Sequence, residues 1–336
     1  MVSRLGQYLR LIRPYGMLFL GLAPVFGAVA NHETRLPVLL LLLLMGCLYH
    51  VFTFVYNDIV DMAVDARSRY VAARPLLQGM VPKKNAVLLA GGAVVFMMVL
   101  AVLIGSVVTF LLALIAVVCA FIYNIGNKRL PFFEYVLGVG ALSLSLAGAA
   151  AAGPQVSMLA WVVAAGFFLQ WVFSVGVAAN LKDVEEDAKS KIYTSPTVFG
   201  VTGTNGKTMI PWLFRVYAAG ISVAYLVVLG LPFELGLVAS SIDGLPIPLV
   251  CYTIISLLLL LTTALLLRGP SPSRDTFLRI TGVHEGLSLL LVPLVLSSRL
   301  LSAIGPSGLL LILGAIIVWP LCWFRLLYGK TLIPLE

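Results

Sequence analysis

Residues 36–65 read LPVLLLLLLMGCLYHVFTFVYNDIVDMAVD, an apolar run that ends in three aspartates. Its first 20 residues contain no Lys, Arg, Asp or Glu, and about 20 apolar residues are enough for a helix to cross a bilayer. Of the 336 residues in the chain, 61% are hydrophobic and 11% are charged, against about 45–50% and about 25% in soluble domains. Membrane barrels show alternating polarity rather than long apolar runs. The sequence therefore predicts an all-α, polytopic transmembrane helical bundle.

Ten apolar runs are long enough to span a bilayer. They lie near residues 15–31, 36–56, 84–104, 107–124, 132–152, 157–179, 209–231, 246–267, 279–298 and 306–326. Of the 22 Lys and Arg residues, 19 lie at the chain ends and in or beside every second loop, two lie in the other loops, and Arg215 lies inside the seventh run. By the positive-inside rule, both termini and the basic loops are cytoplasmic. We expect one integral-membrane domain over residues 1–336, in the cell membrane if the source is prokaryotic.

The N-terminus also has features of a signal peptide, because Arg4, Arg10 and Arg13 precede an apolar run that ends in the small residues 28–30. An uncleaved first helix is favoured, since the charge alternation continues unbroken through it. Four cysteines each stand alone in an apolar run, which favours core packing over a disulfide or a metal site. They are Cys47, Cys119, Cys251 and Cys322.

The acidic residues are scarce and clustered, since seven of the 14 Asp and Glu residues fall in two short windows. These are Asp58, Asp61 and Asp65, and then Asp183, Glu185, Glu186 and Asp187. The first three aspartates are spaced three and then four residues apart, which places them on one face of a helix. Asn180, Asp183 and Asp187 repeat that spacing. Both windows end spans on the cytoplasmic side, so we expect them to face each other across one cavity.

Facing carboxylates form a hard-oxygen site of the kind that Mg²⁺ occupies together with substrate phosphates. Basic residues stand in the loop after the first window, at the exit of the fourth span, and after the second window. They are Arg67, Arg69, Arg74, Lys83 and Lys84, then Lys128 and Arg129, then Lys189 and Lys191. Carboxylates, Mg²⁺ and fixed cations together neutralise the charge of a departing diphosphate. The competing interpretation is structural, because charges at helix ends in cytoplasmic loops are common. The net charge of +8 fits an anionic membrane surface or a phosphorylated substrate, and we expect no nucleic-acid partner.

These residues resemble the motifs of the UbiA superfamily of membrane prenyltransferases. The family motif N-D-x-x-D-x-x-x-D followed by R-P-x-x-x-G stands here as NDIVDMAVD and RPLLQG, with Asn57, Asp58, Asp61, Asp65, Arg74, Pro75 and Gly79. The second motif, D-x-x-x-D, stands as DVEED from Asp183 to Asp187, and smaller matches are LIRPYG and the Tyr123, Lys128, Arg129 set. The resemblance covers about residues 1–208, and residues 209–336 form the C-terminal spans. The family core has nine spans, so it implies an added C-terminal helix here.

The resemblance implies a central cavity with cytoplasmic cap loops and two Mg²⁺ ions. The implied metal ligands are Asp58, Asp61, Asp65, Asp183 and Asp187, supported by Asn57. The implied diphosphate ligands are Arg67, Arg74 and Lys128, with Lys189 and Lys191 after the second motif. Tyr123 would orient the substrate or stabilise a cation through its ring face.

The function implied is transfer of an isoprenyl group from a prenyl diphosphate, through an allylic cation, to a hydrophobic acceptor such as an aromatic quinone precursor. A glycerol-phosphate precursor of an ether lipid is the alternative acceptor. From another class, an ion-coupled transporter would place acids at mid-span, whereas these lie at span ends. A CDP-alcohol phosphotransferase would show D-G-x-x-A-R, but Met62 follows Asp61.

Four other features carry weaker expectations. Residues 200–208, GVTGTNGKT, resemble a phosphate loop but lie between two spans, where a turn and the start of the seventh helix fit better. His50 is either a residue of the acceptor pocket or a core histidine. His284 and Glu285 lie inside the ninth span, either with a functional role or paired with Arg215. Glu134 is expected to be structural.

Overall fold

Ten helices of the described chain are long and apolar enough to cross a membrane, judged by length and composition, in agreement with the ten spans expected. The computed structural model describes residues 3–66, 71–189, 192–204, 207–242, 244–269 and 273–329, with backbone alone for Lys207. The first elements are α1 (Arg4–Ile12), η1 (Pro14–Gly16), α2 (Met17–Ala30), α3 (Leu36–Asp65), α4 (Lys83–Ile104), α5 (Val107–Gly126) and α6 (Glu134–Ala152). Then follow α7 (Met158–Phe173), η2 (Ser174–Ala179), α8 (Asn180–Lys189), α9 (Ser195–Val198), β1 (Thr202–Thr204) and β2 (Lys207–Met209). The last are α10 (Trp212–Glu234), α11 (Ile247–Leu266), α12 (Arg274–Val295) and α13 (Ser297–Tyr328). The predicted all-α membrane bundle is confirmed.

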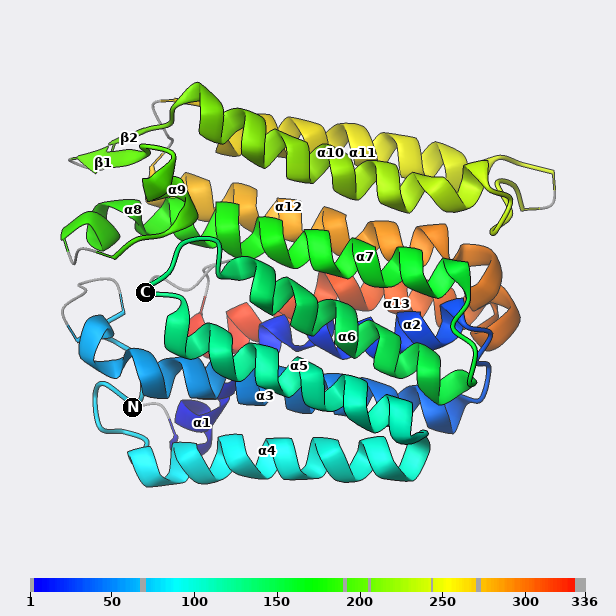
Figure 1. Cartoon of the computed structure of the whole chain (residues 1–336), viewed down its shortest axis with the longest axis horizontal. Helices are drawn as coiled ribbons and strands as arrows, with labels where there is room; N and C mark the ends of the chain where they lie inside the picture. Colours follow the sequence, from blue (N-terminus) through cyan, green and yellow to red (C-terminus); the bar gives the residue numbers. More distant parts are fainter. Residues whose placement is uncertain are drawn as a thin grey trace.

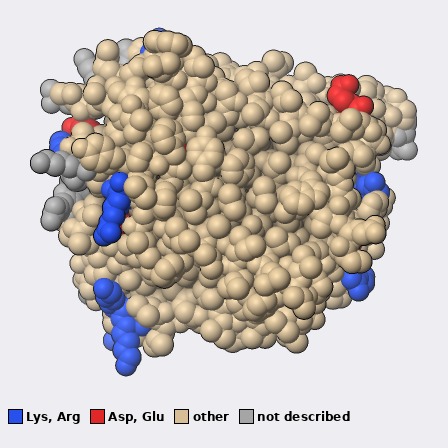
Figure 2. Space-filling model, viewed as in Figure 1, with Lys and Arg blue, Asp and Glu red and all other residues tan. Residues whose placement is uncertain are grey.

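Charged side chains are confined to the ends of the bundle on the face shown in Figure 2, with an uncharged band between them. The long helices run side by side, and the C-terminal end of α3 lies at the same end of the bundle as α8 (Figure 1). This arrangement places the two acidic windows at one end, as expected from the loop charges.

Helix α3 explains how an apolar span ends in aspartates. It has 30 residues, or about 45 Å at 1.5 Å per residue, whereas the hydrocarbon core is about 30 Å thick. Its last turns therefore extend beyond the lipid tails. Asp58, Asp61 and Asp65 all lie on this one helix and are buried in protein.

The connection before α10 differs from the expectation. Strands β1 and β2 pair antiparallel, Thr202 with Met209 and Thr204 with Lys207. The centre of the expected turn, residues 205–206, lies outside the described residues, and the seventh helix begins at Trp212, after Pro211 at its N-cap, rather than at residue 209. Hairpin pairing satisfies the backbone groups of this loop before the helix starts.

The last helix has a break that reconciles its length with the predicted span. Helix α13 contains Gly305 at φ 70° and ψ 178°, followed by Pro306. Only glycine adopts this conformation without strain, and proline cannot donate to the preceding turn. The segment after the break corresponds to the span expected at residues 306–326.

The final helix also packs onto the first turns of the chain. Trp319 Nε1 on α13 donates to the Pro14 carbonyl over 2.6 Å, and Arg10 Nη2 donates to the Leu327 carbonyl over 2.7 Å. The ring of Tyr15 stacks on that of Phe324, 4.4 Å between centroids. The two ends of the described chain are therefore tied together.

Helix α2 lies in the core and approaches its neighbours closely. Nearly every residue from Leu20 to Ala30 is buried, as expected for a helix that is apolar all round. A Cβ built on Gly148 of α6 would lie 1.8 Å from the Pro24 carbonyl oxygen, and one on Gly27 would lie 1.9 Å from the Ser145 carbonyl oxygen. Small residues let the two backbones meet, a common way for membrane helices to associate.

Gly148→Ala is therefore expected to lower the free energy of unfolding by about 1–3 kcal/mol through overpacking. The melting temperature of the detergent-purified protein measures the effect. Gly91→Ala on α4 is the matched control, because a Cβ there meets nothing within 4 Å and alanine is the better helix former. An unchanged melting temperature for Gly148→Ala would contradict the tight α2–α6 contact.

Candidate active site

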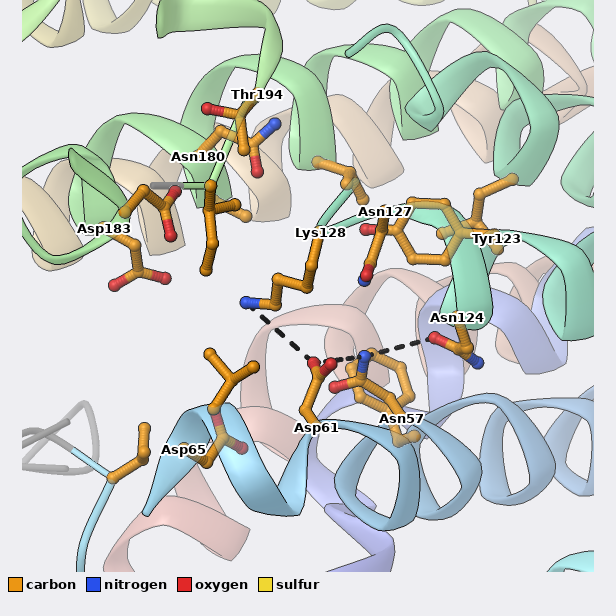
Figure 3. Close-up of a pocket in the computed structure, with 18 of the residues that line it drawn as sticks. Asn57, Asp61, Asp65, Tyr123, Asn124, Asn127, Lys128, Asn180, Asp183 and Thr194 are labelled. Carbon is orange, nitrogen blue, oxygen red and sulfur yellow. Dashed lines mark hydrogen bonds and ion pairs between the residues drawn. The ribbon is translucent and has the colours of Figure 1, made fainter. Parts of the chain in front are cut away.

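Both acidic windows line one cavity of about 240 Å³. Its polar wall contains Asn57, Asp61 and Asp65 from α3, Tyr123 and Asn124 from α5, Asn127 and Lys128 from the following turn, and Asn180, Asp183 and Asp187 from α8. Figure 3 shows Asp61 and Asp65 of α3 on one side of this space and Asp183 on the other. The expectation that the two windows face each other across one cavity is confirmed.

Asp61 stands at the centre of the first acidic wall. Asn57 Nδ2 donates to its Oδ2 over 3.0 Å and also lies 3.2 Å from Asn124 Oδ1. The Asn124 amide donates in turn to the Thr53 carbonyl over 3.1 Å. Lys128 extends into the space between the walls (Figure 3), with its Nζ 3.9 Å from Asp61 Oδ2. This amide network fixes the Asp61 carboxylate on the cavity surface.

Two arginines neutralise the other aspartates of α3. Arg13 Nη2 lies 2.6 Å from Asp58 Oδ1. Arg74 Nη1 lies 3.1 Å from the same oxygen and 2.5 Å from Asp65 Oδ2. Arg74 therefore links Asp58 to Asp65, and both arginines line the cavity. These contacts let three aspartates share one helix face despite their mutual repulsion.

The second acidic wall is less fully paired. Asp183 Oδ1 lies 3.2 Å from Arg274 Nη2, and Asp183 Oδ2 lies 3.8 Å from Lys182 Nζ. Asp187 is 5% exposed and lines the cavity. Among the described residues, its carboxylate has no hydrogen bond or ion pair. A buried carboxylate without a partner is costly, so this wall is suited to an added cation.

Some predicted site residues lie away from the cavity or outside the described residues. Asp58 is paired behind the wall and does not line the cavity. Lys189 forms surface ion pairs with Glu185 and Glu186, at 3.1 and 2.9 Å. Arg67 and Lys191 lie outside the described residues.

Two residues with weaker expectations have structural partners. The His50 Nε2 atom lies 3.1 Å from the carbonyl oxygens of Ile12 and Arg13, which favours the core interpretation. Glu134 is buried and accepts hydrogen bonds from Ser195 and Tyr217, as expected for a structural residue.

The proposed pairing of His284 and Glu285 with Arg215 is wrong. Arg215 Nε donates to the Ile210 carbonyl over 3.1 Å. His284 Nδ1 lies 2.9 Å from the Thr262 hydroxyl. The guanidinium of Arg215 is thus held near the start of its own helix.

Sequence reasoning missed several residues of the cavity. Arg13 belongs to the LIRPYG match, which marked it without assigning it a role. Asn124 and Asn127 stand between Tyr123 and Lys128, in a segment where the resemblance marked only Tyr123, Lys128 and Arg129. Arg274 carried no local signal, since its partner Asp183 lies 91 positions away.

The donor set suits a hard divalent cation. No three His, Cys, Asp or Glu side chains converge on one point among the described residues. The cavity instead presents carboxylate and amide oxygens on two walls, and one of these carboxylates, Asp187, is unpaired within the described part of the chain. Mg²⁺ is usually held by one or two carboxylates and completes its octahedron with water and phosphate oxygens. The oxygen donors present therefore fit Mg²⁺.

A family model described as the UbiA prenyltransferase family matches residues 17–281. The 4-hydroxybenzoate octaprenyltransferase of Neisseria gonorrhoeae (strain NCCP11945) is 32% identical over 212 residues, covering 59% of this chain and 68% of that protein. The protein of the same name from Nitrosospira multiformis is 27% identical over 245 residues, covering 70% and 82%.

Solved structures share the fold. A UbiA homolog from Aeropyrum pernix K1 superposes with a TM-score of 0.66 at 18% identity, covering 86% of this chain and 98% of that one. A UbiA homolog from Archaeoglobus fulgidus bound to GPP and Mg²⁺ gives a TM-score of 0.61 at 19% identity, covering 87% and 99%.

Proposed function

The chain belongs to the UbiA prenyltransferase family, and from that premise we propose that it transfers a prenyl group from a prenyl diphosphate to an aromatic acceptor in a reaction that requires Mg²⁺. One observation carries the proposal: two carboxylate-bearing walls face each other across a cavity that also contains Lys128 and Arg74. The names of the relatives from Neisseria and Nitrosospira support 4-hydroxybenzoate as the acceptor class. The GPP and Mg²⁺ in the Archaeoglobus homolog support the donor and the metal.

The proposed metal ligands are Asp61 and Asp65 on one wall and Asp183 and Asp187 on the other. Asp58, held by two arginines in this structure, stays a prediction as a further ligand. Bound Mg²⁺ would supply positive charge that stabilises the departing diphosphate. Whether one or two ions bind is part of the proposal, and two carboxylate walls favour two.

The chain's own residues would bind the diphosphate and shape the reaction. Lys128 and Arg74 would donate hydrogen bonds to its oxygens as charge develops there. The C–O bond of the prenyl diphosphate breaks, and the diphosphate leaves with the electron pair. A ring carbon of the acceptor bonds to the allylic carbon and loses its proton.

Aromatic side chains would protect and stabilise the allylic cation. Phe54, Tyr123 and Trp171 line the same cavity as the acids. Their ring faces attract a cation, and their apolar bulk excludes water that would otherwise trap it. The prenyl tail would extend among the apolar spans.

We further propose that the acid-bearing end faces the cytoplasm. Of the 22 Lys and Arg residues, 19 belong to the chain ends and loops of that side, the distribution the positive-inside rule predicts for the cytoplasm. A soluble prenyl diphosphate made in the cytoplasm would reach the cavity directly.

The test is an assay of the full chain in lipid nanodiscs with labelled geranyl, farnesyl or geranylgeranyl diphosphate. One arm contains 4-hydroxybenzoate and the other a glycerol phosphate acceptor, and mass spectrometry identifies the products. We expect a prenylated aromatic product, no activity after EDTA treatment, and recovery with Mg²⁺. Product in the glycerol phosphate arm alone would overturn the acceptor class. Activity retained in EDTA would overturn the metal requirement, and no diphosphate release with any donor would overturn the proposal.

A further inference from the structure

The sixth span changes its helical geometry just before the second acidic wall. Helix α7 ends at Phe173, and η2 (Ser174–Ala179) continues as a π-helix into α8. A π turn contains one residue more than an α turn, and such turns are rare. The segment lies between the apolar part of the span and Asp183, so its effect falls on the residues that follow it.

The π turn determines which way the second acidic wall points. Four residues of this span line the cavity. Trp171 precedes the π turn, Val175 lies within it, and Asp183 and Asp187 follow it. At about 100° per residue, an uninterrupted α-helix would place Asp183 about 120° and Asp187 about 160° around the axis from Trp171. With one residue absorbed by the π turn, these angles fall to about 20° and about 60°. The π turn therefore returns both carboxylates to the cavity face.

Helix α12 holds the π turn from one side. The His284 ring stacks on that of Phe173 with centroids 4.4 Å apart and 23° between planes, and Thr262 fixes the imidazole over 2.9 Å. Polar groups at membrane depth need such partners. Glu285, the next residue of α12, lines a small cavity together with Gln170 and Phe173 of α7.

One turn further along α12, a second contact joins the same two helices. Gln170 Nε2 of α7 donates to the Ser288 hydroxyl over 2.9 Å. The Ser288 hydroxyl donates in turn to the Glu285 carbonyl over 2.8 Å. Helix α12 thus contacts the span at Gln170 and Phe173, immediately before the π turn.

Glu134 holds the π turn from the other side. A Cβ built on Gly176 would lie 2.7 Å from both Cγ and Oε1 of Glu134. The Glu134 carboxylate is itself fixed by the hydroxyls of Ser195 and Tyr217. Only glycine at position 176 lets the carboxylate rest against the π-helix, so the turn is confined between α6 and α12.

We propose that Glu134, His284 and Glu285 are positioning residues that hold the π turn and thereby aim Asp183 and Asp187 at the cavity. The inference rests on the proposed function. It assigns a role in the reaction to α12, which lies beyond residues 1–208, the part of the chain that carries the family motifs. Arg274, the first residue of α12, contacts the second acidic wall directly, because it donates a hydrogen bond to the Lys182 carbonyl of α8 over 2.6 Å.

The experiment measures Mn²⁺ binding by electron paramagnetic resonance in the presence of inorganic diphosphate, on the full chain in detergent. The test variants are Glu285→Ala and Gly176→Ala, with Glu285→Gln as the conservative variant that keeps the length and the side-chain oxygen acceptor of Glu285. Thr263→Val is the matched control, because it breaks a buried hydrogen bond of 3.0 Å between Ser222 of α10 and Thr263 of α11 without touching the π-helix. Melting temperatures are recorded for all variants.

We expect Glu285→Ala and Gly176→Ala each to weaken Mn²⁺ binding by about 10-fold, the usual effect of losing an outer partner of a metal ligand. Glu285→Gln should recover most of the affinity, and Thr263→Val should bind as wild type even where its melting temperature falls. Wild-type affinity in both test variants, or equal weakening in Thr263→Val, would overturn the inference alone. Absence of Mn²⁺ binding by the wild type would overturn both the inference and the proposed metal dependence.

Discussion

Asp61→Asn is expected to lower kcat by roughly 10³-fold, the effect of removing one principal electrostatic group from an active site. Asp61 lies on the cavity surface, where Asn57 orients it and Lys128 faces it. The amide has the same shape and still accepts a hydrogen bond from Asn57, so the fold should be retained. Asp183→Asn on the opposite wall should have a similar effect. Diphosphate release, measured alongside the melting temperature, separates activity from stability.

Asp275→Asn is the matched control for both variants. Asp275 lies in the first turn of α12 beside Arg274, is exposed, and does not line the cavity. We expect it to keep activity within about twofold, as for a surface substitution away from the site. Near-normal activity in Asp61→Asn and Asp183→Asn would remove the basis for assigning these carboxylates to the reaction.

Arg74→Met is expected to affect both stability and activity. Asp65 would lose its 2.5 Å partner, and Asp58 would retain only Arg13 among the ion pairs of the described residues. Removing one partner of a buried ion pair destabilises by about 3–5 kcal/mol, which a thermal melt detects. Loss of a cation at the diphosphate should also lower kcat/KM by roughly 10²-fold.

The double variant Arg74→Met with Asp65→Asn distinguishes the two roles of Arg74. A neutral amide at position 65 no longer requires a buried counter-charge, so most of the stability should return. Because Asp65 is itself a proposed metal ligand, activity is compared with that of Asp65→Asn alone. It should be lower still in the double variant, because the guanidinium group that would contact the diphosphate is missing. Equal activity in the double variant and in Asp65→Asn alone would show that Arg74 only supports the fold.

The features of the fold and the site that the sequence predicted correctly are those that depend on short-range periodicity. The apolar runs, the alternation of basic loops and the three-then-four spacing on α3 each depend on residues within one or two turns. The exposed ion pairs of Lys189 with Glu185 and Glu186 were also predictable, because they follow the same helical spacing. They weaken the expectation that this lysine contacts the diphosphate.

Contacts between residues far apart in the chain, and the change of helical register at the π turn, produce no comparable pattern in the sequence. Arg13 pairs with Asp58, which lies 45 positions away in the sequence. A single sequence gives no sign of such a pairing. The π turn adds one residue to the segment Ser174–Ala179, in which every residue is small or aliphatic, so the hydrophobic pattern cannot locate it. The same applies to the role of His284 and Glu285, which depends on which helix packs beside them.

The tie between α13 and the start of the chain has a consequence for biosynthesis. Membrane helices emerge from the ribosome in order, and Arg10 and the Pro14 carbonyl acquire their partners Leu327 and Trp319 only when α13 is inserted. Arg13, beside that contact, supplies the guanidinium that pairs with Asp58. The segment that carries this cavity arginine therefore gains its packing partners on α13 only after the intervening helices have been inserted.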